Sequence, residues 1–215
     1  MVKKMINYDL YDVIFFDFDG VIKESLDIKS DAFKKLFDKH GPEVSRKVLE
    51  HHNSNMGVSR FAKIPLYLGF AGIKTNENLI KEYESNFSKL VFEGVLKSDW
   101  VPGILSFLKK NYVKKHLFIL TATPHQEINK IARILKIDFY FKKIIGSPTS
   151  KSKAIKNIIR LNKFEPSKCL MIGDSKSDHE ATIDSEVPFI LRKTKYNQDM
   201  QFQFNFKMID NFNNE

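Results

Sequence analysis

With 215 residues, 42% of them hydrophobic and 19 of them Phe, the chain is long and apolar enough for a packed core, which excludes a disordered protein. Its single cysteine excludes an internal disulfide framework and fits a reducing compartment. The formal net charge of +9 is spread along the chain in lysine pairs on amphipathic segments, a pattern that favours attraction of phosphorylated small molecules over nucleic-acid binding.

The first expected element is a strand at residues 13–16, an apolar run without alternation. Such a run is typical of a strand buried on both faces of a parallel sheet. Asp17 and Asp19 follow at the carboxyl end, where open α/β sheets bind ligands. A regular strand would place both carboxylates in one site, although Gly20 indicates an immediate bend. Two buried carboxylates favour a cation or a reacting group between them; the alternative is two solvated loop aspartates.

Only helical periodicity follows, from about residue 24 to residue 97. Helices are expected at residues 28–39, 42–52, 58–68 and 76–96, separated by breaks that contain glycine, proline or asparagine. An insertion directly after the first strand would lie over the carboxyl edge of the sheet. We therefore predict an α/β core formed by residues 1–23 and 98–215, and a helical cap domain formed by residues 24–97. Adjacent His51 and His52 diverge on a helix and are expected at the surface.

Short apolar runs and helical patterns alternate through the rest of the chain. Strands are expected at residues 117–120, 143–145, 170–172 and 188–191, and helices at 103–112, 124–135 and 152–161. Thr123 is the expected N-cap of the helix at 124–135, with Pro124 at its first position. This alternation predicts an α/β fold: a Rossmann-like parallel sheet core with an inserted helical cap domain. The Asn- and Gln-rich tail from Tyr196 onward carries only a weak pattern.

Polar side chains follow the later strands too. One strand is followed by a turn rich in hydroxyl groups, which suits an anion, and another by a helix whose first turn carries lysines. A third is followed by two carboxylates four positions apart. The residues concerned are Thr121–Thr123, Lys151, Lys153, Asp174 and Asp178.

In this order and at these strand ends, the motifs resemble those of the haloacid dehalogenase-like (HAD) superfamily over nearly the whole chain. The matching residues are Asp17-Phe18-Asp19-Gly20-Val21, Thr121, Lys153, and Asp174 and Asp178 within residues 173–178. The resemblance is to the phosphatase branch with a helical cap after the first motif, which includes phosphoglycolate phosphatases and β-phosphoglucomutases.

The resemblance implies a phosphatase with an aspartyl-phosphate intermediate. Asp17 would be the nucleophile and Asp19 the general acid and base. Mg²⁺ would be held by the Asp17 carboxylate, the Asp19 backbone carbonyl and Asp174, with Asp178 supporting the lysine or the metal shell. Carboxylate-bound Mg²⁺ suits phosphoryl transfer, which needs positioning and charge stabilisation more than covalent help.

Two of the implied roles have competing residues. Thr121 would hydrogen-bond the transferring phosphoryl group, and Thr123 competes with it but is farther from the strand. Lys153 would neutralise that group; Lys151 competes with it, and the spacing before Ile155 favours Lys153.

Substrate contacts are expected from three residues. Gly57-Val58-Ser59-Arg60 is similar to the cap segment of β-phosphoglucomutases, where an arginine holds the distal phosphate. The alternative is a solvated arginine at a helix start. The expected substrate-binding residues are Arg60, Ala122 and Gly20.

The expected function is a Mg²⁺-dependent phosphatase for a small phosphorylated metabolite, such as a sugar phosphate or phosphoglycolate. The alternatives are a phosphomutase of the β-phosphoglucomutase type and a non-catalytic binding module with a relic HAD fold. We expect a cytoplasmic protein without nucleic-acid or membrane partners. The sequence predicts no particular oligomeric state. The basic start at residues 2–4 is followed by too short an apolar run for a signal peptide, and no stretch approaches the roughly 18 apolar residues of a membrane span.

Overall fold

A six-stranded parallel sheet forms the centre of the molecule, as the computed structural model of residues 6–213 shows. The basic residues 2–4 lie outside this range. The strand order is β3-β2-β1-β4-β5-β6, and each neighbouring pair is parallel. The predicted α/β class is therefore confirmed. The strands are β1 (Val13–Phe16), β2 (His116–Pro124), β3 (Lys143–Ser147), β4 (Cys169–Gly173), β5 (Phe189–Arg192) and β6 (Lys207–Ile209).

Strand β1 is apolar throughout because helices cover both faces of the sheet beside it. Ile14 and Phe16 belong to the apolar cluster on one face, with α5 (Ile104–Asn111) and α6 (His125–Ile134). Val13 and Phe15 belong to the other cluster, with α7 (Lys151–Asn162) and α8 (Lys176–Ile183). All four strand residues are fully buried, which explains the absence of alternation in the sequence.

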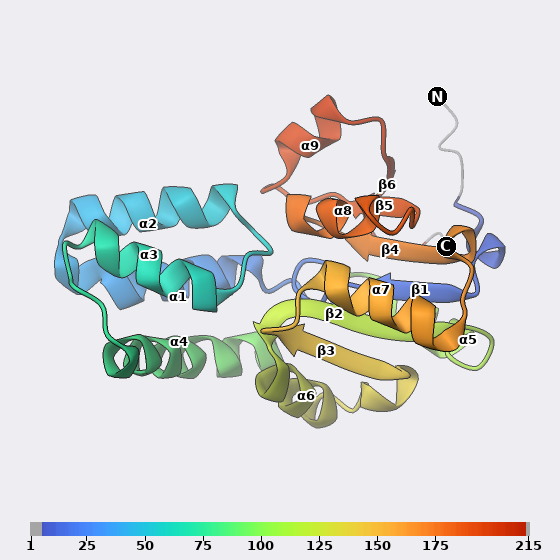
Figure 1. Ribbon diagram of the computed structural model, residues 1–215, viewed down its shortest axis with the longest axis horizontal. Helices are drawn as coiled ribbons and strands as arrows, with labels where there is room; N and C mark the ends of the chain where they lie inside the picture. The colour runs from blue at the N-terminus through green and yellow to red at the C-terminus, as the bar shows by residue number, and fades with distance from the viewer. Residues whose placement is uncertain (1–5, 214–215) are drawn as a thin grey trace.

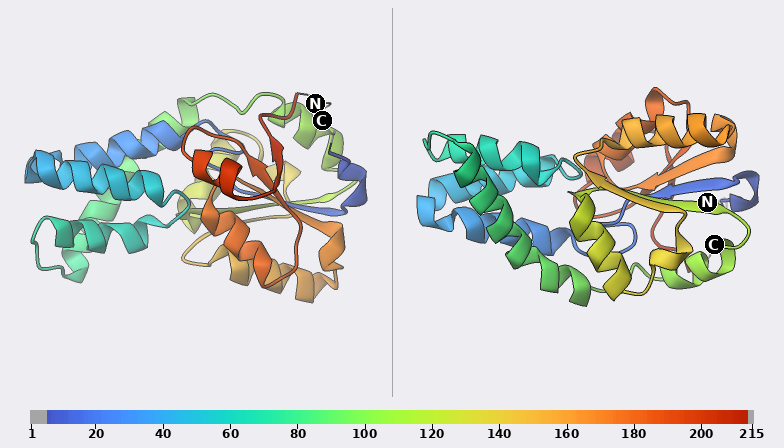
Figure 2. Two further views of the ribbon diagram at one scale, coloured as in Figure 1. Left: turned by 90° about the horizontal axis from the view of Figure 1, so that it is seen from above. Right: turned by 60° about the horizontal axis from the view of Figure 1, so that its bottom comes forward.

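A helical insertion, residues 26–97, follows β1 and lies beyond the carboxyl ends of the strands (Figures 1 and 2). Its helices are α1 (Leu26–Phe37), α2 (Pro42–Ser54), α3 (Arg60–Phe70) and α4 (Glu77–Lys97). Each corresponds to a predicted helix, with ends shifted by a few residues. The chain returns through Trp100, which pairs with Lys23 in an antiparallel bridge. The division into domains at residues 23/24 and 97/98 stays a prediction.

Aromatic side chains form the core of this helical insertion. Phe33 packs on Phe87 with ring centroids 4.0 Å apart, and Tyr67 contacts both Phe33 and Phe37 edge-on. These residues belong to the same apolar cluster as one face of the sheet. The insertion and the sheet are thus joined by a continuous core.

Two parts of the chain differ from the sequence-based expectation. Helix α6 begins at His125 with Pro124 as its N-cap, so the prediction of Thr123 as N-cap is wrong. The Thr123 hydroxyl instead donates to Asp19 Oδ2 at 3.1 Å. The weakly patterned tail contains α9 (Gln198–Gln203) and β6, neither of which was predicted. No helix in the part of the chain that the structure describes is long and apolar enough to cross a membrane.

Candidate active site

Asp17 lies directly after β1 at the carboxyl edge of the sheet, where it is buried. Its Oδ1 accepts a hydrogen bond from the Phe18 backbone N–H at 2.7 Å, and its Oδ2 lies 3.0 Å from Lys151 Nζ. Burial raises the pKa of Asp17 to about 7 in spite of this lysine, and the nearby Asp178 and Asp19 charges add to the effect. The Asp17 site therefore favours a further positive charge.

Lys151, and not Lys153, is the lysine of this site. Its Nζ lies 3.0 Å from Asp17 Oδ2 and 2.6 Å from Asp178 Oδ1. Lys153 is exposed, and its backbone N–H donates to the N-cap hydroxyl of Ser150. The sequence-based choice of Lys153 is therefore wrong.

Helical periodicity gives the physical reason for this correction. Lys151 shares a helix face with Ala154, Ile155 and Ile158, at positions i+3, i+4 and i+7. These three residues are buried against the sheet, so the first turn of α7 carries Lys151 to the sheet edge. Lys153 is outside this series. The same period, applied to the sequence, would have identified Lys151.

Three buried carboxylates meet beside Lys151. Oxygens of Asp17, Asp174 and Asp178 all lie within 4.8 Å of one another. Asp178 Oδ2 accepts from the Ser175 backbone N–H at 3.1 Å and from its hydroxyl at 2.5 Å. Asp178 is therefore occupied on both oxygens, by Lys151 and by Ser175, and supports the lysine.

Asp174 supplies the carboxylate of this cluster that is available to coordinate a cation. Its Oδ2 is buried and has no hydrogen-bond partner within residues 6–213. Burial, followed by the charges of Asp17 and Asp178, raises the pKa of Asp174 well above its usual range. Hard divalent cations prefer carboxylate oxygens, and such a cation would satisfy this orphaned atom. The donor set of Asp17 and Asp174 fits a cation of this kind.

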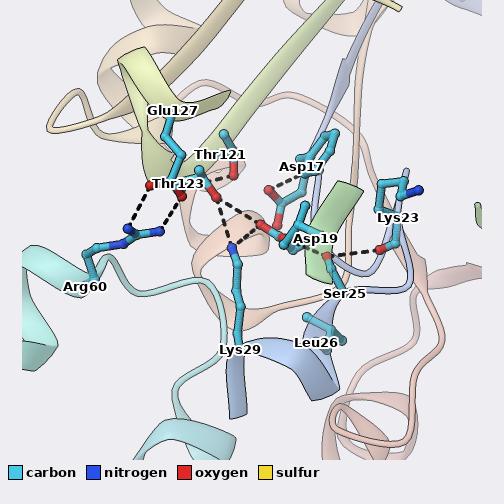
Figure 3. A network of polar contacts seen from close by, with 12 residues as sticks. Asp17, Asp19, Lys23, Ser25, Leu26, Lys29, Arg60, Thr121, Thr123 and Glu127 are labelled. Atoms are coloured by element: carbon cyan, nitrogen blue, oxygen red, sulfur yellow. Dashed lines mark hydrogen bonds and ion pairs between the residues drawn. The ribbon is translucent and has the colours of Figure 1, made fainter. Parts of the chain in front are cut away.

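Asp19 lies in a second polar cluster (Figure 3). Its carboxylate accepts hydrogen bonds from Ser25 Oγ at 2.6 Å, from Thr123 Oγ1 at 3.1 Å and from Lys29 Nζ. Burial alone would raise the pKa of Asp19, but the Lys29 ammonium and the hydrogen bonds lower it below its usual value. The strand ends before these residues, so Asp17 and Asp19 share one cavity but contact different partners.

The cavity between the sheet edge and the helical insertion holds about 40 Å³, room for a few water molecules. It brings together most of the sequence-predicted site residues. The core contributes Asp17, Asp19, Thr121, Ala122, Thr123 and Asp174, and the insertion contributes Lys29, His52, Arg60 and Lys63. Thr121 and Thr123 both line the cavity, and Thr121 Oγ1 accepts from the Thr123 backbone N–H at 3.2 Å.

Gly20 is required by the backbone at this site. Its φ is +78°, and a Cβ there would lie 2.5 Å from Asp174 Oδ2. A side chain at this position would therefore displace the carboxylate. Direct contact of Gly20 with substrate stays a prediction.

Arg60 is buried, so the alternative of a solvated arginine is wrong. Its NH1 and NH2 donate to Glu127 at 2.9 and 2.6 Å (Figure 3). NH1 also donates to Ser88. Sequence analysis missed Glu127, which lies on α6 of the core and has no local pattern that marks it. The role of Arg60 as a phosphate ligand stays a prediction.

His52 and Lys63, like Lys29, line the cavity and were missed by the sequence analysis. Both are buried, and Lys63 Nζ lies 2.9 Å from His52 Nδ1. The expectation of a surface position is wrong for His52. It shares the buried face of α2 with Ser45 and Val48, at positions i−7 and i−4, and this period was the available signal.

Comparisons with known proteins agree with this geometry. The family model described as haloacid dehalogenase-like hydrolase matches residues 14–191. Among curated proteins, none matches the chain.

Solved structures with the same fold include three from bacteria. A predicted phosphoglycolate phosphatase from Haemophilus somnus is 18% identical, with 94% of this chain and 95% of that chain covered and a TM-score of 0.73. β-Phosphoglucomutase from Clostridium difficile is 20% identical, with 94% and 92% covered and a TM-score of 0.73. CbbY from Rhodobacter sphaeroides, in complex with phosphate, is 16% identical, with 94% and 95% covered and a TM-score of 0.72. At these identities the likeness shows the fold.

Proposed function

Because the chain belongs to the haloacid dehalogenase-like hydrolase family, we propose that it is a Mg²⁺-dependent phosphatase for a small phosphorylated metabolite. The observation that carries this proposal is the buried group of Asp17, Asp174, Asp178 and Lys151 at the carboxyl edge of the sheet. It combines a carboxylate nucleophile, the oxygen ligands of a divalent cation and a fixed ammonium group. Phosphoryl transfer through an aspartyl-phosphate intermediate uses these three features.

The metal would be held by Asp17 and Asp174, with the Asp19 carbonyl as a proposed third ligand. When bound, Mg²⁺ neutralises charge on the phosphoryl oxygens and offsets the repulsion between the carboxylates. Asp178 contributes by holding Lys151, whose ammonium faces Asp17. Lys151 thus takes the role of phosphoryl neutralisation that the resemblance implied for Lys153.

In the proposed reaction an Asp17 oxygen forms a bond to phosphorus as the ester oxygen leaves with a proton. Water then attacks the phosphorylated Asp17 and releases phosphate. Asp19 exchanges the proton in both steps. Its contact with Lys29 lowers its pKa and favours the carboxylate, which accepts a proton from water. Donation in the first step requires the protonated form, which separation from Lys29 would favour.

The helical insertion would act as a cap over this chemistry. The cavity beneath it is too small for a sugar phosphate, so substrate entry requires the insertion to move away from the sheet edge. Closure afterwards excludes bulk water and strengthens the electrostatic interactions around the phosphoryl group.

A phosphomutase is the second candidate. The insertion places Lys29, Arg60 and Lys63 on the cavity, and a mutase must hold a second phosphate. Such an enzyme would turn over only when primed by a bisphosphate. A non-catalytic binding module is disfavoured, because the carboxylates and the lysine are all in place.

The test is phosphate release from a panel of sugar phosphates, phosphoglycolate and nucleotides, with Mg²⁺ or with EDTA. We expect Mg²⁺-dependent release from one class of compound, and we expect none from the Asp17→Asn variant, which serves as the blank. Near-normal release by Asp17→Asn would contradict the covalent mechanism. No phosphate release, together with isomerisation of a sugar phosphate only after a sugar bisphosphate is added, would identify the mutase instead.

A further inference from the structure

Lys63 is a buried cation that has no carboxylate partner within the described part of the chain. Its exposed fraction is 2%, and it lines the same cavity as Asp17. The other cations of the cavity region are balanced: Lys29 by Asp19, Arg60 by Glu127 and Lys151 by Asp17 and Asp178. For Lys63, no acidic group lies within ion-pair distance in residues 6–213. A buried charge left unbalanced in this way indicates a place for an anion.

His52 adds a second donor at the same position. In its charged form Lys63 Nζ carries only donors, so its contact with His52 Nδ1 then requires Nδ1 to accept. The neutral ring then carries its hydrogen on Nε2. This Nε2 is buried and has no hydrogen-bond partner among the described residues, and His52 is one of the residues that line the cavity. The pair therefore presents donors that lack an acceptor.

The protonation of both residues agrees with this arrangement. Burial, followed by the Lys63 charge, lowers the pKa of His52 to about 2 and keeps the ring neutral. Burial, followed by the Lys29 charge, lowers the pKa of Lys63 to about 7. An anion beside Lys63 would favour its charged form and satisfy the His52 N–H.

We propose that Lys63 and His52 form a subsite for a second oxyanion of the substrate, a carboxylate or a further phosphate. This subsite rests on the proposed function and deepens it, because the subsite limits the substrate to a small phosphate ester with another acidic group. Arg60 does not serve this purpose in the closed arrangement, since two of its nitrogens already bind Glu127. Lys63 is the cation that remains for the ligand.

Calorimetric binding of unreactive phosphonates in Mg²⁺ tests the subsite without turnover. The probes are phosphonoacetate, ethane-1,2-diyl bisphosphonate and ethylphosphonate, which carry a carboxylate, a second phosphonate and no second acid, respectively. We expect the wild-type protein to bind one acidic probe at least about tenfold more tightly than ethylphosphonate. Which acidic probe is preferred distinguishes a carboxylate from a second phosphate.

Lys63→Met should reduce this preference to about threefold or less, since it removes the charge but keeps the length and apolar stem. His52→Phe is the second variant, which retains a ring against Phe33 but removes the Nε2 donor, and it should also reduce the preference. The matched control is Lys81→Met on the exposed surface of the same insertion, where the preference should be unchanged. Thermal unfolding checks that each variant is folded.

Equal binding of the three probes, no measurable binding of either acidic probe, or an unchanged preference in both folded variants would overturn the subsite. These outcomes are independent of phosphate release. A protein that binds acidic phosphonates through Lys63 but releases no phosphate from any ester would overturn the phosphatase and retain the subsite.

Discussion

Asp17 is buried beside other carboxylates. This position suits the proposed nucleophile, but burying the ionised carboxylate there reduces the stability of the folded protein. Its pKa is raised to about 7, chiefly by burial, so the ionised form is disfavoured in the folded protein. In the unfolded chain an aspartate ionises near pH 4. Between these values the folded state binds the additional proton, and stability decreases as the pH rises.

Asp17→Asn should therefore stabilise the metal-free protein at neutral pH. In EDTA we expect the variant to have a Tm several degrees above that of the wild type at pH 8, since about 1 kcal/mol corresponds to roughly 2–4 °C in a chain of this size. At pH 4 the difference should disappear, because Asp17 is then protonated in the folded protein. Mg²⁺ should reduce the difference at pH 8 by binding the wild type. Scanning calorimetry at the two pH values, with and without Mg²⁺, measures all three effects; a constant difference at both pH values would contradict the raised pKa.

Lys151 and Lys153 form a matched pair, two residues apart on one helix. Lys151→Met should lower kcat by roughly 10²–10³-fold, since it removes the ammonium that faces Asp17. Lys153→Met should change kcat by less than about twofold, because the side chain is exposed. Steady-state kinetics with p-nitrophenyl phosphate compares them, and equal losses in the two variants would mean that Lys151 does not act on the phosphoryl group.

At the scale of elements, the loop between α2 and α3 joins the helical insertion to the start of α8. Gly57 in this loop has a φ of +82°, and a Cβ there would lie 2.3 Å from the hydroxyls of Ser175 and Ser177. Ser175 cannot rotate away freely, since its hydroxyl donates to Asp178 at 2.5 Å. The glycine thus allows the loop to approach the carboxylate cluster.

Gly57→Ala should therefore impair catalysis as well as stability. We expect kcat/KM to fall at least about fivefold as Ser175 shifts away from Asp178, in addition to roughly 1 kcal/mol of left-handed backbone strain. Gly72→Ala is the control: it has a φ of +69° but no atom within 4 Å of the added Cβ. This variant should lower the free energy of unfolding measured in urea through the same backbone strain. Its kcat/KM should stay within about twofold of the wild-type value. A comparable catalytic loss in Gly72→Ala would show that strain alone is responsible.

Over the whole molecule, the ion pair of Arg60 and Glu127 connects the insertion to the core. It joins α3 to α6, and both side chains are largely buried, with exposed fractions of 4% and 11%. Breaking a buried pair by removing one partner is typically destabilising by roughly 3–5 kcal/mol, because the other charge is left unbalanced. In this protein, separation of the insertion from the core would relieve that cost by exposing Arg60 to water.

Glu127→Gln should therefore shift the molecule toward an open arrangement. We expect a larger radius of gyration by small-angle scattering and faster proteolysis of the connecting segment around Trp100. Glu93→Gln is the control, since Glu93 is exposed and pairs with the exposed Lys97 of the same helix. An unchanged radius of gyration in Glu127→Gln, at saturating Mg²⁺, would show that the ion pair does not hold the insertion closed.

Local patterns in the sequence were sufficient to predict the α/β class, the helices of the insertion and the residues that the core contributes to the cavity. An apolar run without alternation identified β1, and helical periodicity identified α1–α4. Asp17, Asp19 and Asp174 were found because they follow strands, and Thr121 because it lies near the carboxyl end of β2; the carboxyl ends of parallel strands meet at one edge. These inferences depend on neighbouring residues and on the general geometry of parallel sheets.

Tertiary packing alone decided the remaining contacts. The choice of Lys151 depends on how α7 is rotated against the sheet, and Arg60 meets Glu127 only because the insertion folds onto α6. His52 and Lys63 approach each other because α2 and α3 pack around Phe33. Such pairs lie on separate helices, and their distances depend on the rotation and placement of whole helices. A local sequence pattern indicates which face of a helix is buried, but the residue opposite that face is determined by the packing of the complete chain.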